Sequence, residues 1–284
     1  MAPRSLLTRI RVAWVFVADA VRLALRTPGT RQKLRILGLA ARSFLSVASR
    51  QPGLLGRIFR APPLREYELR PGPDAPVLRL RSNDMVVMEV YGGRPYELDY
   101  SPIGPVRSVL DIGANVGAAS AFLAARFPEA KIVAVEPNPF TFELLEENLR
   151  RVAPGGIAIN AAIVPSPGRY RLEAGTSPSN DKVIPADGAS ADGRLGTLTM
   201  NELLDKHLHD GVDLVKLDIE GGERALLERA VEWAPRVGAL VAETHEPLTP
   251  ERATELLMDA GFEPLPLPDR IATRDIVFCR RRRG

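Results

Sequence analysis

The fold of this chain is decided by one stretch, Val109-Leu110-Asp111-Ile112-Gly113-Ala114-Asn115-Val116-Gly117. Its apolar start predicts a buried strand, and its two glycines predict a sharp turn that leads into a helix. Glycine lets the backbone turn with a positive φ, and it lets a ligand approach without a side chain in the way. The stretch is therefore typical of the first strand, turn and helix of a nucleotide-binding α/β sheet.

A second apolar run, residues 132–135, ends in an acidic residue, Glu136. Doubly wound folds use an acid at the carboxyl end of the second strand to bind ribose hydroxyls. The turn before it lacks the third glycine of a GxGxxG motif, and Asp111 would face a pyrophosphate with a like charge. These residues disfavour a dinucleotide and favour a nucleoside with a cationic, phosphate-free tail, such as S-adenosylmethionine.

Strand and helix patterns alternate from Val106 onward. Strands are predicted at 107–112, 131–136, 157–163, 213–218, 237–243 and near 274–280, and helices at 115–126, 139–151, 222–233 and 250–260. Such alternation predicts an α/β fold with a parallel, doubly wound, Rossmann-like sheet. Short alternating runs at 67–70, 77–80 and 85–91 predict an antiparallel preamble. We therefore expect a basic amphipathic helical extension (1–60), a β preamble (61–105) and a catalytic domain (106–284).

The net charge of +3 conceals a strong asymmetry. Residues 1–60 hold twelve Lys or Arg and one acid, Asp19, whereas the remainder holds 26 basic and 34 acidic residues. Apolar residues at helical spacing, Val17 and Val21 among them, predict a first helix with Arg22 and Arg26 on its opposite side. A second run places Ile36, Leu37, Ala40 and Phe44 opposite Arg31, Arg35 and Arg42. These helices either pack on protein or contact an anionic membrane surface.

A single cysteine, Cys279, excludes an intramolecular disulfide and favours a reducing compartment. Ala18-Asp19-Ala20 resembles a signal-peptide cleavage site, but the apolar core before it is only about seven residues, at the lower limit for a signal peptide. We therefore expect a cytoplasmic protein, with peripheral membrane contact through residues 1–60 left open.

Residues 165–196 interrupt the alternation with many turn-forming residues. So long an irregular stretch in a compact domain is a functional loop, a disordered loop or an unrecognised hairpin. Residues 169–172 are a candidate strand of such a hairpin. A lid over the acceptor pocket and a mobile surface loop remain equal alternatives.

A cluster of charged residues ends the strand predicted at 213–218. Asp218 and Glu220 come at its carboxyl end, where open α/β sheets bind ligands. Two carboxylates held close together repel each other, which would raise the pKa of one of them and suit it to proton transfer. A solvated turn is the alternative, with Glu223 simply the acid of a helix N-terminus. Lys216, inside the strand, is expected to pair with an acid because an unpaired buried lysine is costly.

His245 is the histidine best placed for chemistry. It follows the strand predicted at 237–243, whereas His207 and His209 lie in a polar stretch. A histidine at the ligand edge can take a proton from a substrate hydroxyl, because its pKa lies near neutrality. Asp218, Glu220 and His245 would hold a cation only if they converged, so no metal site is predicted.

Three motifs together resemble the FkbM family of S-adenosylmethionine-dependent methyltransferases. They are Asp-Ile-Gly-Ala-Asn-Val-Gly (111–117) with Glu-Pro-Asn-Pro-Phe (136–140), Lys-Leu-Asp-Ile-Glu-Gly-Gly-Glu (216–223), and Glu-Thr-His (243–245). The resemblance covers roughly residues 85–260, and the second motif is the most specific. Where the family typically has Thr-Leu-Asp, this chain has Thr-Met-Asn at 199–201.

The resemblance implies a class I methyltransferase sheet and a role for each matching residue. Gly113, Asn115 and Gly117 would line the methionine part of the cofactor, with Asp111 beneath the turn. Glu136 would bind both ribose hydroxyls, and Asn160 or the nearby Ala162 would lie near the adenine. Asp218 and Glu220 would sit close to the reactive methyl group and the incoming nucleophile, with His245 as the base.

The function implied by the resemblance is O-methylation of a hydroxyl on a small molecule, a sugar or glycolipid, or a polyketide-type acceptor. The arginine-rich ends and Asn138-Pro139-Phe140 prompt a second hypothesis, a nucleic-acid methyltransferase. That tripeptide follows the second strand, whereas the Asn-Pro-Pro-Tyr motif of amino-methylating enzymes follows the fourth, and the acidic catalytic domain offers no basic groove. A third hypothesis is a membrane- or partner-binding protein that retains a cofactor-like domain.

Overall fold

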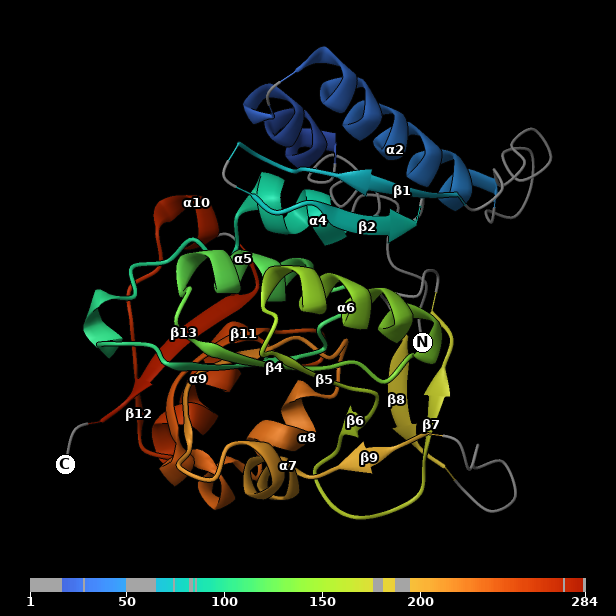
Figure 1. Ribbon diagram of the computed structural model, residues 1–284. Helices are drawn as coiled ribbons and strands as arrows, with labels where there is room; N and C mark the ends of the chain where they lie inside the picture. The colour runs from blue at the N-terminus through green and yellow to red at the C-terminus, as the bar shows by residue number, and fades with distance from the viewer. Residues whose placement is uncertain are drawn as a thin grey trace. The chain divides into compact units, whose positions relative to one another are not determined.

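The computed structural model describes residues 17–27, 29–49, 65–73, 75–81, 84, 86–175, 181–186, 195–272 and 274–282 (Figure 1). The chain forms two compact units, residues 1–94 and 95–284. The part of the predicted first helix before residue 17 lies outside the described residues, as do residues 50–64, whose prolines and glycines are typical of a linker. The division expected at residues 60 and 105 stays a prediction.

The described part of the first unit combines helical segments with a two-stranded sheet. Residues 17–26 are helical, and α2 spans Thr30–Ser49. The antiparallel pair is β1 (Glu66–Leu69) with β2 (Leu78–Arg81), as the alternating pattern predicts. The strand expected at 85–91 is wrong, because these residues form α4 (Val86–Met88) and a π-helical turn at Glu89–Gly93. Gly92 allows this turn to pack against the first helix, since a Cβ there would collide with the carbonyl of Asp19.

The amphipathic faces of the first helix differ from those expected. Its buried side is formed by Asp19, Ala20, Leu23 and Ala24. Val17 and Val21 are exposed, as are Arg22 and Arg26, so the valines do not lie on a buried face opposite the arginines. On α2, Ile36 is buried as expected but Leu37 is 44% exposed.

The second unit is built on a seven-stranded sheet in the order β12-β13-β11-β10-β3-β4-β5. Five of its strands are parallel and run from β11 to the edge strand β5: β3 (Ser108–Ile112), β4 (Lys131–Val135), β5 (Ile157–Ile159), β10 (Val212–Leu217) and β11 (Val237–Glu243). β13 (Ile276–Arg281) and β12 (Phe262–Pro264) complete it in antiparallel pairing. The chain reverses its direction of travel across the sheet between β3 and β10, which makes this edge a topological switch point. The predicted doubly wound α/β sheet is confirmed.

Helices cover both faces of this sheet (Figure 1). One face carries α5 (Ala118–Arg126) and α6 (Pro139–Val152), and the other carries α7 (Met200–His207), α8 (Glu223–Leu227) and α9 (Pro250–Asp259). α10 (Asp269–Ala272) precedes β13, and a 3-10 turn at Ser101–Ile103 precedes β3. The helix expected at 222–233 is shorter, because two 3-10 turns, Ala230–Glu232 and Ala234–Arg236, follow α8.

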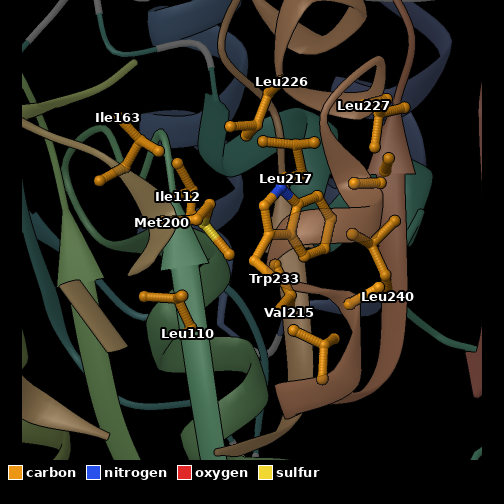
Figure 2. Packing of buried hydrophobic residues seen from close by; sticks show 14 of the residues in the cluster. Leu110, Ile112, Ile163, Met200, Val215, Leu217, Leu226, Leu227, Trp233 and Leu240 are labelled. Atoms are coloured by element: carbon orange, nitrogen blue, oxygen red, sulfur yellow. The ribbon is translucent and has the colours of Figure 1, made fainter. Parts of the chain in front are cut away.

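The alternation of side chains along β3 explains the two sides of the core. Leu110 and Ile112 point into a large apolar cluster with residues of β10, β11, α7 and α8 (Figure 2). Asp111 lies between them in sequence and therefore faces the opposite side of the sheet, toward α5. Trp233 packs in the same cluster with Leu217 and Leu240. A rigid apolar layer thus fixes the strand ends from which the candidate site residues project.

The irregular segment after β5 contains the expected hairpin. The strand predicted at 157–163 is broken, so that β6 (Ala162–Ile163) leaves the main sheet and pairs with β9 (Thr197–Leu198). β7 (Tyr170–Glu173) and β8 (Lys182–Pro185) then form an antiparallel pair. Asp181, just before β8, accepts a hydrogen bond from the side chain of Asn138 at 2.6 Å. Residues 176–180 and 187–194 lie outside the described part of the chain, and the choice between lid and surface loop stays open.

Candidate functional site

The turn after β3 has the backbone that its glycines predict. Gly113, Asn115 and Gly117 have φ values of 76°, 51° and 84°. A Cβ at Gly113 would collide with the carbonyl oxygen of Asp218, so this position requires glycine. The backbone N–H groups of Gly113 and Ala114 donate to the carbonyl of Val135 at 3.0 and 2.9 Å. The turn is thus fixed against β4 on one side and against the end of β10 on the other.

Asp111 lies beneath this turn, as the resemblance implies. Its carboxylate has no exposed surface, accepts a hydrogen bond from the Ser120 hydroxyl at 2.6 Å and lies 3.1 Å from Nζ of Lys216. Lys216 is itself buried, and it also donates to the carbonyl of Gly113 at 2.8 Å and lies 3.5 Å from Asp218. Burial would lower the pKa of Lys216, but Asp111 and Asp218 raise it above its usual value. The expected pairing of Lys216 with an acid is confirmed.

Glu136 is held at the carboxyl end of β4 by the backbone around it. Its two carboxylate oxygens accept hydrogen bonds from the N–H groups of Asn115 and Asn138, both at 2.9 Å. The residue is 6% exposed, and burial raises its pKa to about 7, against the opposing effect of these two bonds. Each oxygen keeps a lone pair for a further donor. Asn160 donates to the carbonyls of Glu136 and Pro137, so it lies beside the same strand end.

A second turn follows β10 and carries the acidic cluster. Asp218 is the first residue beyond the strand, and Glu220 has a φ of 56°, an unusual value for a residue with a side chain. Glu223 has no exposed surface and accepts hydrogen bonds from the N–H groups of Ile219 and Gly221 at 2.8 and 2.9 Å. Its carboxylate therefore lies inside the turn and does not serve as an exposed acid at a helix N-terminus.

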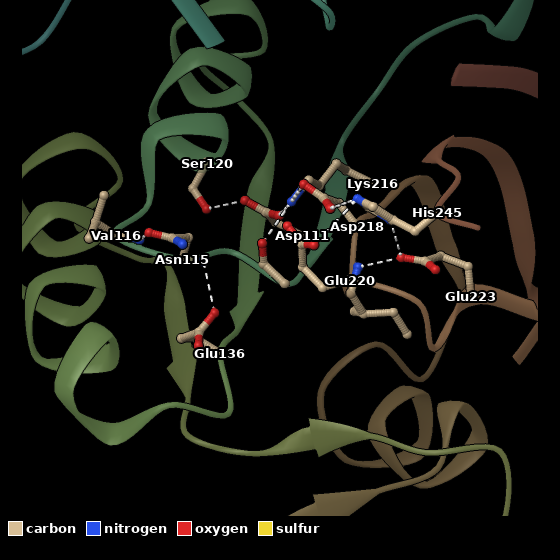
Figure 3. A network of polar contacts seen from close by, with 12 residues as sticks. Asp111, Asn115, Val116, Ser120, Glu136, Lys216, Asp218, Glu220, Glu223 and His245 are labelled. Carbon is tan, nitrogen blue, oxygen red and sulfur yellow. Dashed lines mark hydrogen bonds and ion pairs between the residues drawn. The ribbon is translucent and has the colours of Figure 1, made fainter. Parts of the chain in front are cut away.

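His245 joins this cluster from the end of β11 (Figure 3). Its Nδ1 lies 2.9 Å from Oε1 of Glu223. Because a carboxylate only accepts, Nδ1 carries a proton, and Nε2 faces the substrate side, where it can accept a proton only when the ring is neutral. Nε2 lies 3.6 Å from Glu220 and 4.0 Å from Asp218. Burial would lower the pKa of His245, but the bond to Glu223 and the charges of Asp218 and Glu220 outweigh burial and raise the pKa to about 10.

Asp218, Glu220 and His245 converge. One potential ligand atom from each lies within 4.8 Å of the others. The sequence analysis made a cation site conditional on this convergence, and the condition is met. The gap between the three side chains can therefore accept either a cation or an acceptor hydroxyl. The prediction of no metal stays a prediction, and it is one that a chelator tests directly.

Two functional features escaped the sequence. The orienting role of Glu223 was missed because an acid in a first helical turn is common for local reasons. Ser120, one turn into α5, was not singled out, although it caps Asp111. The spacing of the Lys-x-Asp-x-Glu-Gly-x-Glu string was the available signal, since it places four charged residues around one strand end.

Some candidate positions lie away from the cluster. Thr199 caps α7 and Met200 is buried in the core, while Asn201 lines a cavity of about 310 Å³ with Arg229 and Trp233. None of the predicted site residues lines this cavity, so we place the chemistry at the strand ends. His207 ends α7, and His209 lies just beyond it and is exposed.

Comparison with known proteins identifies the family. The profile of the methyltransferase FkbM domain matches residues 111–264. This match spans the glycine turn, Glu136, the β10 turn and His245. The chain belongs to the FkbM methyltransferase family.

Individual relatives agree with the family. Methyltransferase sdnD of Sordaria araneosa is 27% identical over 63% of this chain and 81% of its own length. Hexuronic acid methyltransferase AglP of Haloferax volcanii is 29% identical over 53% of this chain and 61% of its own length. The fibrillarin of Aeropyrum pernix was solved with natively bound S-adenosyl-L-methionine, and its match covers 63% of this chain and 68% of the fibrillarin chain. The two sequences are 17% identical, and the TM-score is 0.38.

As an FkbM family member, the chain is an S-adenosylmethionine-dependent methyltransferase. Its residues fit this cofactor. Acids outnumber the cations Lys216 and His245 at the carboxyl ends of the strands, which leaves a negative potential that suits a sulfonium cation; the acids are Asp111, Glu136, Asp218, Glu220 and Glu223. The positive-φ turn presents backbone without side chains at two of its positions, and Glu136 offers carboxylate oxygens to ribose hydroxyls.

Proposed function

We propose that this FkbM methyltransferase transfers the methyl group to a hydroxyl oxygen of a small molecule, either a sugar or glycolipid or a polyketide-type acceptor. The observation that carries the proposal is the Glu223–His245 pair, 2.9 Å apart, with the imidazole Nε2 facing Asp218 and Glu220. Such a pair is the arrangement of a positioned general base, because the buried carboxylate fixes the ring orientation and tautomer.

Each residue of the site has a separate role in methyl transfer. S-adenosylmethionine, when bound, supplies a methyl group on a positively charged sulfur. His245 Nε2 removes the proton of the acceptor hydroxyl, and Glu223 stabilises the imidazolium that results. Asp218 and Glu220 orient the hydroxyl by hydrogen bonding. Lys216 holds Asp111, Asp218 and the Gly113 carbonyl in one place, so the donor turn and the base share a common support.

A base distinguishes between acceptor groups. A carboxylate is already ionised near neutral pH and needs no base for methylation, whereas a hydroxyl must lose its proton. The name of AglP gives a hexuronic acid as its acceptor, and such a sugar carries both groups. The Glu223–His245 pair favours the hydroxyl of such an acceptor over its carboxylate. Nucleic acid is disfavoured, because the acidic strand ends would repel a phosphate backbone.

Labelled methyl transfer tests the proposal. The chain is incubated with isotopically labelled S-adenosylmethionine and extracts of its host, and labelled products are identified by mass spectrometry. We expect the label in an alkali-stable ether on a low-molecular-weight or lipid-linked acceptor. An alkali-labile ester would move the acceptor group to a carboxylate, and label in nucleic acid would overturn the proposal.

The place of action is inferred from the cysteine. The chain has one cysteine, Cys279, which is fully buried in β13. Burial raises the pKa of its thiol to about 12, so it is not a reactive group. These features support a cytoplasmic location.

A further inference from the structure

The first helix and α2 of the first unit both expose large apolar side chains. Val17, Val21 and Leu25 are 40%, 43% and 73% exposed and recur every four residues, so they form one stripe along the first helix. Leu34 and Leu37 of α2 are 64% and 44% exposed. These five residues account for most of the large apolar side chains exposed in the described part of the chain. Single exposed apolar residues are ordinary, but a recurring stripe marks an interaction surface.

Cations accompany these apolar side chains. Arg22 and Arg26 follow the valine stripe on the exposed side of the first helix, and Arg31 lies on the exposed side of α2 near Leu34. Arg22 pairs with the buried Asp19, which is the single acid of residues 1–60. The apolar surface is therefore set in a strongly basic segment, with a balance of +11 over residues 1–60.

We infer that the exposed apolar side chains between Val17 and Leu37, together with the arginines beside them, form a surface that docks on an anionic lipid bilayer. An interfacial helix of this kind inserts its apolar stripe among the acyl chains, while the arginines beside the stripe contact lipid phosphates. Charge complementarity selects a bilayer with anionic headgroups over a neutral one. None of the described helices has both the length and the hydropathy needed to span a membrane. The inference concerns residues 17–41 and stands apart from the proposed methyl transfer.

Vesicle co-sedimentation of the full chain is the primary test. Vesicles of phosphatidylcholine alone are compared with an equal mixture of phosphatidylcholine and phosphatidylglycerol, each at low and high salt. We expect sedimentation with the mixed vesicles, weakened by salt, and little with the neutral ones. Equal binding to both vesicle types, or binding to neither, would overturn the inference.

Substitutions separate the two components of the surface. The double variant Arg26→Gln, Arg31→Gln should bind mixed vesicles about thirtyfold more weakly. Val21→Glu with Leu25→Glu should weaken binding by about tenfold or more, because charge is then forced into the acyl region. Both pairs are exposed, so the fold tolerates them. The matched control is Val231→Glu, at a 62% exposed valine of the second unit, and it should bind as the parent does.

A fluorescent label reports whether the stripe itself enters the bilayer. Because Cys279 is buried, Leu25→Cys provides a selective attachment point for an environment-sensitive dye. We expect a blue shift with mixed vesicles, and no shift when the dye is attached after Val231→Cys. An unshifted label at position 25 would overturn the inference. So would a stable dimer that Leu25→Glu dissociates, since it would assign the surface to a second copy of the chain.

Discussion

Oε1 of Glu223 lies 2.9 Å from Nδ1 of His245, and this carboxylate has no exposed surface. Two backbone N–H groups of the β10 turn bind the same carboxylate. The orientation of the imidazole is therefore set by the fold, and its second nitrogen is directed to the acidic gap beside the donor turn. This relationship leads to the first prediction.

His245→Gln should lower kcat by about a hundredfold or more while leaving the affinity for S-adenosylmethionine nearly unchanged, because the base is lost and the donor contacts remain. Glu223→Gln keeps the shape but lets the ring choose the other tautomer, so kcat should also fall. Steady-state kinetics and calorimetry measure the two quantities. Full turnover in His245→Gln would remove His245 from the mechanism.

Turnover should rise from neutral to alkaline pH. His245 acts as a base only when neutral, and its pKa is raised to about 10 by Glu223, Asp218 and Glu220 despite burial. A bound sulfonium cation would lower that pKa, so the rise should come at lower pH in kcat than in kcat/KM. pH profiles of kcat and kcat/KM for the parent chain measure the two rises. The residual activity of His245→Gln should show neither rise.

Binding of S-adenosylmethionine should strengthen as pH rises through about 7, where the buried Glu136 loses its proton. The carboxylate would accept from both ribose hydroxyls, whereas the protonated acid would accept more weakly. Glu136→Ala should abolish binding measured by calorimetry. Glu136→Gln should bind weakly at every pH, and unchanged affinity in either variant would sink the assignment.

Stability should fall as pH rises. Glu136 and His245 both bind protons more tightly in the folded chain, with pKa values of about 7 and 10 against ordinary values of 4.5 and 6.5. Their stabilising contributions are complete below those ordinary values. The contribution of Glu136 is lost as pH rises from 4.5 to 7, and the contribution of His245 is lost as pH rises from 6.5 to 10. For each proton, the free energy of unfolding falls with a limiting slope of about 1.4 kcal/mol per pH unit. Urea unfolding across this range measures the effect, and Glu136→Gln should flatten only the lower part.

Lys216→Met should destabilise the fold by about 3–5 kcal/mol, because it leaves the buried Asp111 carboxylate without its cation. The control is Arg224→Met, which removes one partner of the exposed pair with Glu228 and should cost about 1 kcal/mol or less. Denaturant unfolding compares the two variants. Equal small losses would show that Ser120 alone is sufficient for Asp111.

Methyl transfer should survive prolonged treatment with a chelator. The gap between Asp218, Glu220 and His245 is assigned to the acceptor hydroxyl, so no cation is required there. Activity is measured before and after dialysis against EDTA. Loss of activity that Mg²⁺ or Mn²⁺ restores would convert the cluster into a metal site.

The sequence predicted the catalytic sheet well because the pattern of apolar residues and the positions of the turn-forming residues indicate the same elements. The central strands are mainly apolar runs that end near polar clusters, although β3 contains Asp111 and β10 contains Lys216, and glycine marks the turn at 113. Residues 85–91 misled because their valines and methionines suit a strand, yet Val87, Met88 and Val90 are buried within a helical turn. Tertiary burial decided that segment over local preference.

The phase of the first helix was also beyond local information. Its apolar residues occur on two adjacent stripes, and the stripe with the small residues Ala20 and Ala24 is the one that packs, while Val17 and Val21 stay exposed. The partnership of Glu223 with His245 was hidden for a similar reason, since the two lie 22 residues apart and meet only through the parallel pairing of β10 with β11.

The missing Cβ at Gly113 has an evolutionary consequence. The turn proposed to hold the methyl donor meets the β10 turn, which carries Asp218 and Glu223, at the carbonyl of Asp218, so this contact excludes any side chain at position 113. We expect acceptor preference to differ among family members through the insertion between β6 and β9, whose hairpin is tied to Asn138 by Asp181 and places Lys182 beside Gly221 of the β10 turn.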